Sequence, residues 1–76
     1  MIKEHDRIVL MNDIPSEGLL TGDVGTVIHV YKEGEAFEVE FVTLGGETVS
    51  VITLPSSQVR AVDKRDIANA RKLAIS

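Results

Sequence analysis

The sequence predicts a mainly β protein, with a small five-stranded barrel over residues 1–62 and a short C-terminal α-helical tail over residues 63–76. Three observations predict this class. Short runs of β-branched and aliphatic residues recur along the chain, and turns rich in glycine or proline separate them at short intervals. Apolar residues make up 43% of the 76 residues but aromatic residues only 4%, so we expect one domain with an aliphatic core.

The first two strands are predicted at residues 6–11 and 24–31, which are rich in valine, isoleucine and leucine. Pro15 and Gly18 interrupt the segment between them, because proline cannot donate to a ladder and glycine permits a positive φ. We therefore expect a long ordered loop at that place. Gly25 lies inside the second strand, where we expect a bulge or a sharp bend.

The third strand, predicted at residues 36–42, follows a hairpin loop and has the clearest pattern in the chain. Apolar and acidic side chains alternate with the period of a β-strand. We expect Glu38 and Glu40 to face water. The apolar side chains of this strand are expected to face the core: Phe37, Val39 and Phe41.

Two further segments complete the sheet. Residues 47–53 predict a fourth strand with Val49 and Val51 facing inward, residues 54–58 a single helical turn, and residues 59–62 a short closing strand. Five short strands in about sixty residues are too few for a sandwich of two sheets. We therefore expect them to curl into a closed barrel, which also removes exposed strand edges.

The tail has a helical pattern over residues 64–75, with Asp63 as its N-cap. Asp66 near the start, and Arg71 and Lys72 near the end, suit the helix dipole. The apolar stripe is narrow, and a helix of about twelve residues is marginal alone. Three states follow: a frayed terminus, a helix docked on its own barrel, or a helix bound to another subunit, such as a second copy.

The charge is divided between the two parts of the chain. Residues 1–63 hold four Lys or Arg and eleven Asp or Glu, which gives a net charge of −7. Residues 64–76 hold four Lys or Arg and one Asp, which gives a net charge of +3. Nucleic-acid binding is unlikely for a body at −7, because that affinity depends on cations placed along phosphates. The start of the chain has no signal-peptide pattern and no segment has the length of a membrane span, so with no cysteine present we expect a cytoplasmic protein.

Three segments together resemble SH3-like barrels with a KOW-type element: residues 18–27, which contain GDVGTV, the alternating third strand, and residues 54–62. More closely, residues 1–62 resemble a bacterial family of small proteins known only as a domain of unknown function. The resemblance implies an SH3-like barrel without assigned activity or site residues. It also implies an arrangement in which the gene lies beside that of another small protein, as toxins lie beside their neutralisers or subunits beside accessory proteins.

The sequence has no pattern typical of catalysis or of metal and cofactor binding. His5 and His29 are the only histidines, and neither belongs to a spacing such as H-x-H or H-E-x-x-H. Gly18, Gly22 and Gly25 lack the Lys-Ser/Thr pair of a phosphate-binding loop, and a strand follows them where such a loop precedes a helix. No loop alternates acidic residues around a glycine as calcium loops do. We expect no enzymatic activity, no cofactor and no metal.

Surface charge gives the candidate partner-binding residues. Glu33, Glu35, Glu38 and Glu40 are expected to form an acidic surface, which is either an ordinary solvated face or a docking surface for a basic partner. Arg71 and Lys72 in the tail are the second candidate. Three aromatic residues are too few to line a groove for proline-rich peptides.

The function expected from these features is a non-enzymatic module that binds a partner protein through its acidic surface or its tail. One alternative is an antitoxin-like neutralising or accessory protein for a neighbouring gene product. The other is a KOW-like protein that binds nucleic acid or the ribosome through the basic tail cluster, which consists of Lys64, Arg65, Arg71 and Lys72.

Overall fold

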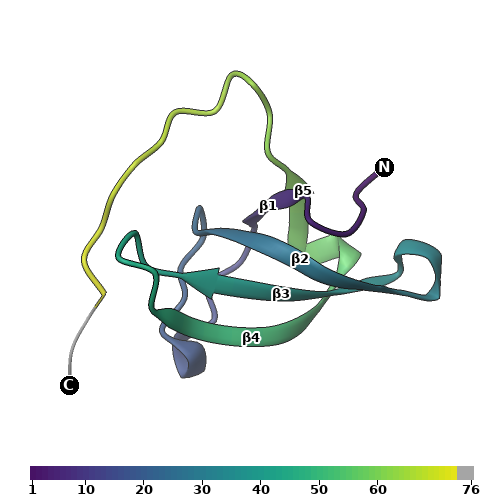
Figure 1. The fold of residues 1–76 in the computed structure, drawn as a ribbon, viewed down its shortest axis with the longest axis horizontal. Coiled ribbons are helices and arrows are strands. Elements are labelled where there is room, and N and C mark those ends of the chain that lie inside the picture. The colour runs from purple at the N-terminus through teal and green to yellow at the C-terminus, as the bar shows by residue number, and fades with distance from the viewer. Residues whose placement is uncertain (74–76) are drawn as a thin grey trace.

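The computed structural model describes residues 1–73 and confirms the five strands, which form one antiparallel sheet (Figure 1). The strands are β1 (Arg7–Leu10), β2 (Val24–Tyr31), β3 (Ala36–Val42), β4 (Thr48–Pro55) and β5 (Val59–Ala61). Three single turns of 3₁₀ helix lie in the connections: η1 (Pro15–Glu17), η2 (Lys32–Gly34) and η3 (Ser56–Gln58). The order across the sheet is β4-β3-β2-β1-β5.

The expected barrel is wrong, because the two end strands of the sheet do not pair with each other. η3 connects β4 directly to β5, but β5 has three residues and pairs only with β1. In Figure 1, β5 runs steeply across the direction of β2, β3 and β4, which shows how strongly the sheet bends. The sheet therefore curls around its core without closing, and β4 keeps an unpaired edge.

The core is aliphatic apart from two phenylalanines, as the composition predicts. Phe37, Val39 and Phe41 of β3 are confirmed as inward-facing, with exposed fractions of 3%, 0% and 2%. Leu19 reaches the core from the long loop between β1 and β2. The buried cluster as a whole consists of Ile8, Leu10, Leu19, Val27, Phe37, Val39, Phe41, Leu54 and Val59.

The predicted alternation of inward and outward side chains in β4 is wrong at the centre of the strand. Val51 is 45% exposed, and the inward side chains are those of Ser50, Ile52 and Leu54. Phe41 pairs with Ser50 whereas Val42 pairs with Thr48, so Val49 is an extra residue that forms a bulge in β4. The inward direction predicted for Val49 is confirmed, because its half-buried side chain packs against the core. Residues that lie opposite each other share a face of the sheet, and the inward side chains of β3 therefore set the phase of β4 beyond the bulge.

Gly25 has a different role from the expected bulge. The register of β2 against β3 shifts between Val27 and His29, three residues further along the strand. Gly25 is buried, and a Cβ atom there would lie 2.5 Å from Cγ1 of Val39 and 2.9 Å from Cε1 of Phe41. Glycine is therefore needed at this position because the core leaves no room for a side chain.

The expected C-terminal helix is absent from the described residues, and the helix prediction is wrong. Residues 62–73 are an irregular, largely extended strap. The guanidinium of Arg60 binds the carboxylate of Asp66 through two hydrogen bonds of 3.0 and 2.7 Å. Asp63 makes the hydrogen bond expected of an N-cap, since its carboxylate accepts from the amide of Arg65, but only a turn follows it and no helix. Residues 74 and 75 of the predicted helix lie outside the described residues, and residues 1–73 hold no helix long and apolar enough to cross a bilayer.

The strap returns to the sheet at its far end. Arg71 donates from Nε and Nη2 to Asp23, at 2.9 and 2.6 Å, and from Nη2 to the carbonyl of Gly18 at 2.9 Å. Five residues from Asp66 to Arg71 span about 17 Å when extended but only about 8 Å as a helix. The extended form lets Arg71 reach Asp23, and it leaves the side chain of Ile67 91% exposed.

Candidate functional site

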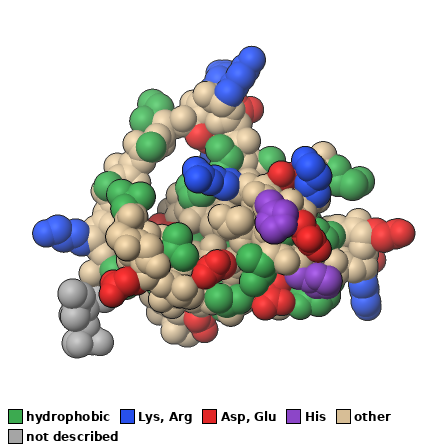
Figure 2. Space-filling model, in the orientation of Figure 1, with side chains coloured by type: hydrophobic (Ala, Val, Ile, Leu, Met, Phe, Trp, Pro, Cys, Tyr) green, Lys and Arg blue, Asp and Glu red, His purple; other side chains and the backbone are tan. Residues whose placement is uncertain are grey.

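The four glutamates of the predicted acidic surface lie on or beside β3, and we call this set the acidic face: Glu33, Glu35, Glu38 and Glu40. Glu38 and Glu40 point to the outer side of the sheet and are half-buried by their neighbours on adjacent strands. Glu33 and Glu35 are exposed in and beside η2, at one end of β3. Figure 2 shows acidic and hydrophobic side chains interspersed over the sheet, with most lysines and arginines nearer its margin.

Glu38 is held by an aromatic neighbour on β2. The hydroxyl of Tyr31 donates to Oε1 of Glu38 at 2.6 Å. The ring of His29 packs edge-on against Tyr31, with ring centroids 4.5 Å apart. The hydrogen bond to Glu38, together with partial burial and the charge of that carboxylate, raises the pKa of Tyr31 above its ordinary value. Tyr31 therefore stays a neutral donor to Glu38.

Glu40 is oriented in the same way by a hydroxyl from β4. It lies between Thr26 on β2 and Val51 on β4 in the sheet register. The hydroxyl of Thr48 donates to Oε2 of Glu40 at 2.9 Å. Both central carboxylates are thus positioned by neutral donors, which fix their direction without cancelling their charge.

The ion pairs among residues 1–73 leave the acidic face uncompensated. None of its four glutamates lies within 4.0 Å of a cationic nitrogen among the described residues, and only aspartates pair with Lys or Arg there. Those pairs are Asp6 with Lys3, Asp66 with Arg60 and Asp23 with Arg71. Glu4, near the N-terminus, lies 3.8 Å from Nδ1 of His29, a pair that is ionic only when the histidine is protonated.

The tail candidates Arg71 and Lys72 are not brought together with the acidic face. Arg71 is engaged by Asp23, and Lys72 is exposed beside it. Burial acts to raise the pKa of Asp23, but the hydrogen bonds from Arg71 and from the amide of Leu20 outweigh it, and the pKa is lowered. Arg71 thus serves as the outer anchor of the strap.

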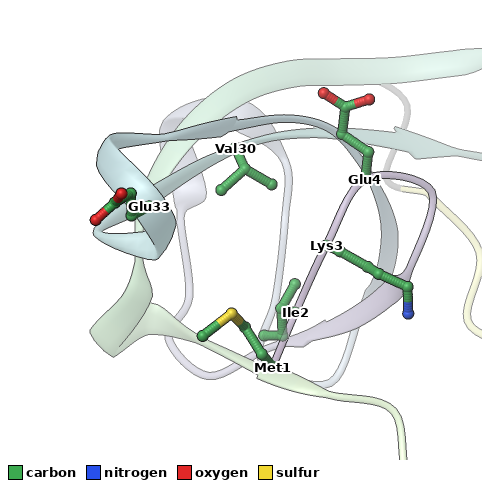
Figure 3. A pocket seen from close by; sticks show the side chains of 6 residues that line it. All are labelled: Met1, Ile2, Lys3, Glu4, Val30 and Glu33. Atoms are coloured by element: carbon green, nitrogen blue, oxygen red, sulfur yellow. The ribbon is translucent and has the colours of Figure 1, made fainter.

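A separate hollow of about 690 Å³ lies at the N-terminus and shares only Glu33 with the acidic face (Figure 3). Met1, Ile2 and Val30 supply its apolar lining, and the charged groups of the remaining residues lie around it. Its rim combines Lys3 and Glu4 with Glu33, so it favours neither sign of ligand charge.

The backbone of His5 and the ring of His29 each make one contact with β2. The amide of His5 donates to the carbonyl of Val27 at 2.7 Å, and the ring of His29 packs on Tyr31. His29 is not among the residues that line the N-terminal hollow. Within residues 1–73, no group of three His, Cys, Asp or Glu side chains is arranged to hold a metal ion.

Sequence reasoning missed the residues that shape the acidic face. Tyr31 and Thr48 orient its central carboxylates, while exposed apolar side chains at Val42 and Val51 border them. Tyr31 could have been found from the hairpin alone, since it alternates with His29 on β2 and faces β3 across a short loop. Val51 could not, because its direction depends on the bulge in β4.

Comparison with known proteins identifies the family. The comparisons with curated proteins and with solved structures gave no match. The model of a family described as a domain of unknown function, DUF4926, matches residues 4–61. This match spans the whole sheet from β1 to β5, including the acidic face, and ends before the strap. Since it covers well over half of the chain, the protein belongs to the DUF4926 family.

Proposed function

We propose that the protein is a non-enzymatic interaction module of the cytoplasm, which binds a partner protein with a basic surface through the acidic face. One observation carries the proposal: within residues 1–73, the four glutamates have no cationic partner of their own. Complementary charge on a partner would supply the missing cations, and would also speed association and fix the orientation of the complex.

The surroundings of the acidic face support binding. Tyr31 and Thr48 hold the central carboxylates in place, so a partner does not have to immobilise them. Val42 and Val51 are 49% and 45% exposed on the same part of the sheet. Apolar area with oriented polar groups beside it is typical of protein interfaces.

The resemblance to the bacterial family of unknown function, which implies a gene beside that of another small protein, supports a more specific form of the proposal. The protein would then neutralise or assist the product of a neighbouring gene, and the acidic face would cover a basic functional surface of that product. For the alternative of nucleic-acid binding, the basic tail cluster is the relevant surface, but Arg71 already binds Asp23.

The proposal is tested by isolating partners of the tagged protein from native lysate at low and high salt. The variant Glu38→Gln/Glu40→Gln removes two charges but keeps oxygen acceptors for Tyr31 and Thr48. The matched control Asp13→Asn/Asp63→Asn removes the same charge elsewhere. It also keeps acceptors for the groups that bind Asp13 and Asp63, which are Thr21 and the amide of Arg65.

We expect the wild type and the control to retain the same basic protein, with less retained as salt rises. The glutamine variant should bind it roughly thirtyfold more weakly, since two lost charge pairs at about 1 kcal/mol each reduce the binding free energy by about 2 kcal/mol. Equal retention by all three proteins would contradict the proposal. Recovery of nucleic acid that is lost on Lys64→Gln/Arg65→Gln substitution would favour the alternative.

A further inference from the structure

The edge of β4 that faces away from β3, which we call the free edge, is the one long unpaired strand edge among the described residues. β4 has eight residues and pairs only with β3, whereas β5 at the other end of the sheet has three. An unpaired strand edge presents a row of amide and carbonyl groups that can pair with another chain. Natural edges are protected by charged side chains, by proline, by bulges or by being short. The bulge at position 49 and Pro55 protect the two ends of β4, but residues 50–54 between them include no charged residue and no proline.

The direction of the backbone groups along the free edge follows from the register. The amide of Ser56 donates to the carbonyl of Glu35, in line with the β3–β4 pairing. In an antiparallel ladder, residue pairs that exchange backbone hydrogen bonds alternate with pairs that do not. Counting back from Ser56, Ile52 is hydrogen-bonded to β3, whereas the amides and carbonyls of Val51 and Thr53 point away from β3. No backbone hydrogen bond from elsewhere in residues 1–73 reaches these outward groups of Val51 and Thr53.

From this geometry we infer that an extended basic segment of a partner protein adds to the sheet as a sixth strand along the free edge of β4. The inference rests on the proposed function and specifies how the acidic face is engaged. Main-chain hydrogen bonds to Val51 and Thr53 would provide affinity, and side chains that alternate between the two faces would provide specificity.

The negative charge beside the free edge favours a basic segment as the added strand. From position 33 to position 59 the chain holds five glutamates and no lysine or arginine. In the sheet register Glu40 lies next to Val51, and Glu38 lies next to Thr53. An added strand would run about 10 Å from β3, at two strand spacings, so lysine or arginine side chains at positions two apart would extend over Val51 and Thr53 toward the two carboxylates.

The other face of the added strand selects apolar residues. Its side chains there would lie beside Ile52, which is half-buried and packs against the core. The expected segment therefore alternates basic and apolar residues. A second copy of this chain suits the edge less well, because β4 itself has no lysine or arginine to place beside Glu38 and Glu40.

The test uses an acetylated and amidated eight-residue peptide that alternates lysine and valine, with a peptide of four lysines followed by four valines as its control. Amide hydrogen exchange of the wild-type protein is measured by NMR. We expect the amides of Val51 and Thr53 to exchange rapidly in the free protein and at least about tenfold more slowly with the alternating peptide. The amide of Ile52, already bonded to β3, should be protected in both states.

A variant gives the second measurement. Val51→Pro removes an outward amide and leaves the ladder to β3 intact, as Pro55 does at a position of the same phase. The dissociation constant of the alternating peptide should rise at least about tenfold in this variant. The control peptide should bind more weakly to the wild type than the alternating one does.

The outcomes separate this inference from the function on which it rests. Suppose that Glu38→Gln/Glu40→Gln weakens binding of the peptide, while the peptide does not slow amide exchange at Val51 and Thr53 and Val51→Pro does not change its dissociation constant. The acidic face then binds the peptide without strand addition, and the inference is overturned. If Glu38→Gln/Glu40→Gln binds the alternating peptide as tightly as the wild type does, the proposed function fails. Dimerisation of the free protein with protection of the same two amides would assign the edge to a second copy and overturn the inference.

Discussion

The buried glycine of β2 allows a quantitative test of how the sheet packs. In the variant Gly25→Ala, the new Cβ atom would lie 2.5 Å from Cγ1 of Val39 and 2.9 Å from Cε1 of Phe41. The first distance is about 1 Å shorter than the optimal separation of two carbon atoms. Overpacking of this kind costs about 1–3 kcal/mol, which in a domain of this size lowers Tm by about 5–20 °C. Thermal unfolding followed by circular dichroism measures the shift.

Gly45→Ala is the matched control for this substitution. Gly45 lies in the β3–β4 turn without a positive φ, and the nearest atom to its added Cβ would be the hydroxyl oxygen of Thr43 at 3.7 Å. We expect its stability to stay within about 0.5 kcal/mol of the wild type. A Gly25→Ala protein as stable as the Gly45→Ala protein would refute the packing of Val39 and Phe41 against β2 described above.

Three further predictions concern the charged surface. Glu38→Ala should lower the pKa of Tyr31 toward its ordinary value, because it removes both the hydrogen bond and the negative charge. Ultraviolet titration can follow this because the chain has one tyrosine and no tryptophan, and an unchanged titration would argue against the hydrogen bond. Arg60, aided by a backbone amide, lowers the pKa of Asp66 to about 2, below the unfolded value of 3.8. The ion pair of Arg60 with Asp66 should therefore stabilise the strap at neutral pH, and this stabilisation should be lost as the pH falls from about 4 toward 2. An NMR titration should find the pKa of Asp66 raised from about 2 toward 3.8 in Arg60→Ala, although the amide of Asp63 still donates to its carboxylate, and a value still near 2 would exclude Arg60 as the cause. Arg71→Ala should increase amide exchange in residues 67–73 while Tm changes by less than about 5 °C, and unchanged exchange would show that the strap is held by other contacts.

Much of the sheet could be predicted because its signals are local. The alternation around β3 depends on neighbouring residues only, and the inward direction of Phe37, Val39 and Phe41 followed from it. The ends of β2 and β3 followed from the turn residues that flank them. The outward direction of Glu38 and Glu40, and so the centre of the candidate site, came from the same alternation.

The remaining features depend on residues that are distant in the sequence. The phase of β4 is set by a bulge against β3, and no pattern within β4 reveals it. The strap is held by Asp23, which is 48 residues from Arg71 in the chain. Helix propensity in the tail was a weak preference, and two ion pairs to the body of the protein were enough to override it.

The most direct test of the account is NMR mapping of a basic ligand on the isotope-labelled protein, with the alternating lysine–valine peptide as the probe. We predict that the chemical-shift changes on addition of the peptide concentrate on β3 and β4, and that they are smaller in Glu38→Gln/Glu40→Gln. The largest changes are expected at Glu38, Glu40, Val51 and Thr53. Shifts centred on the N-terminal hollow or on the strap, with β3 and β4 unaffected, would contradict the claim that the acidic face is the binding surface.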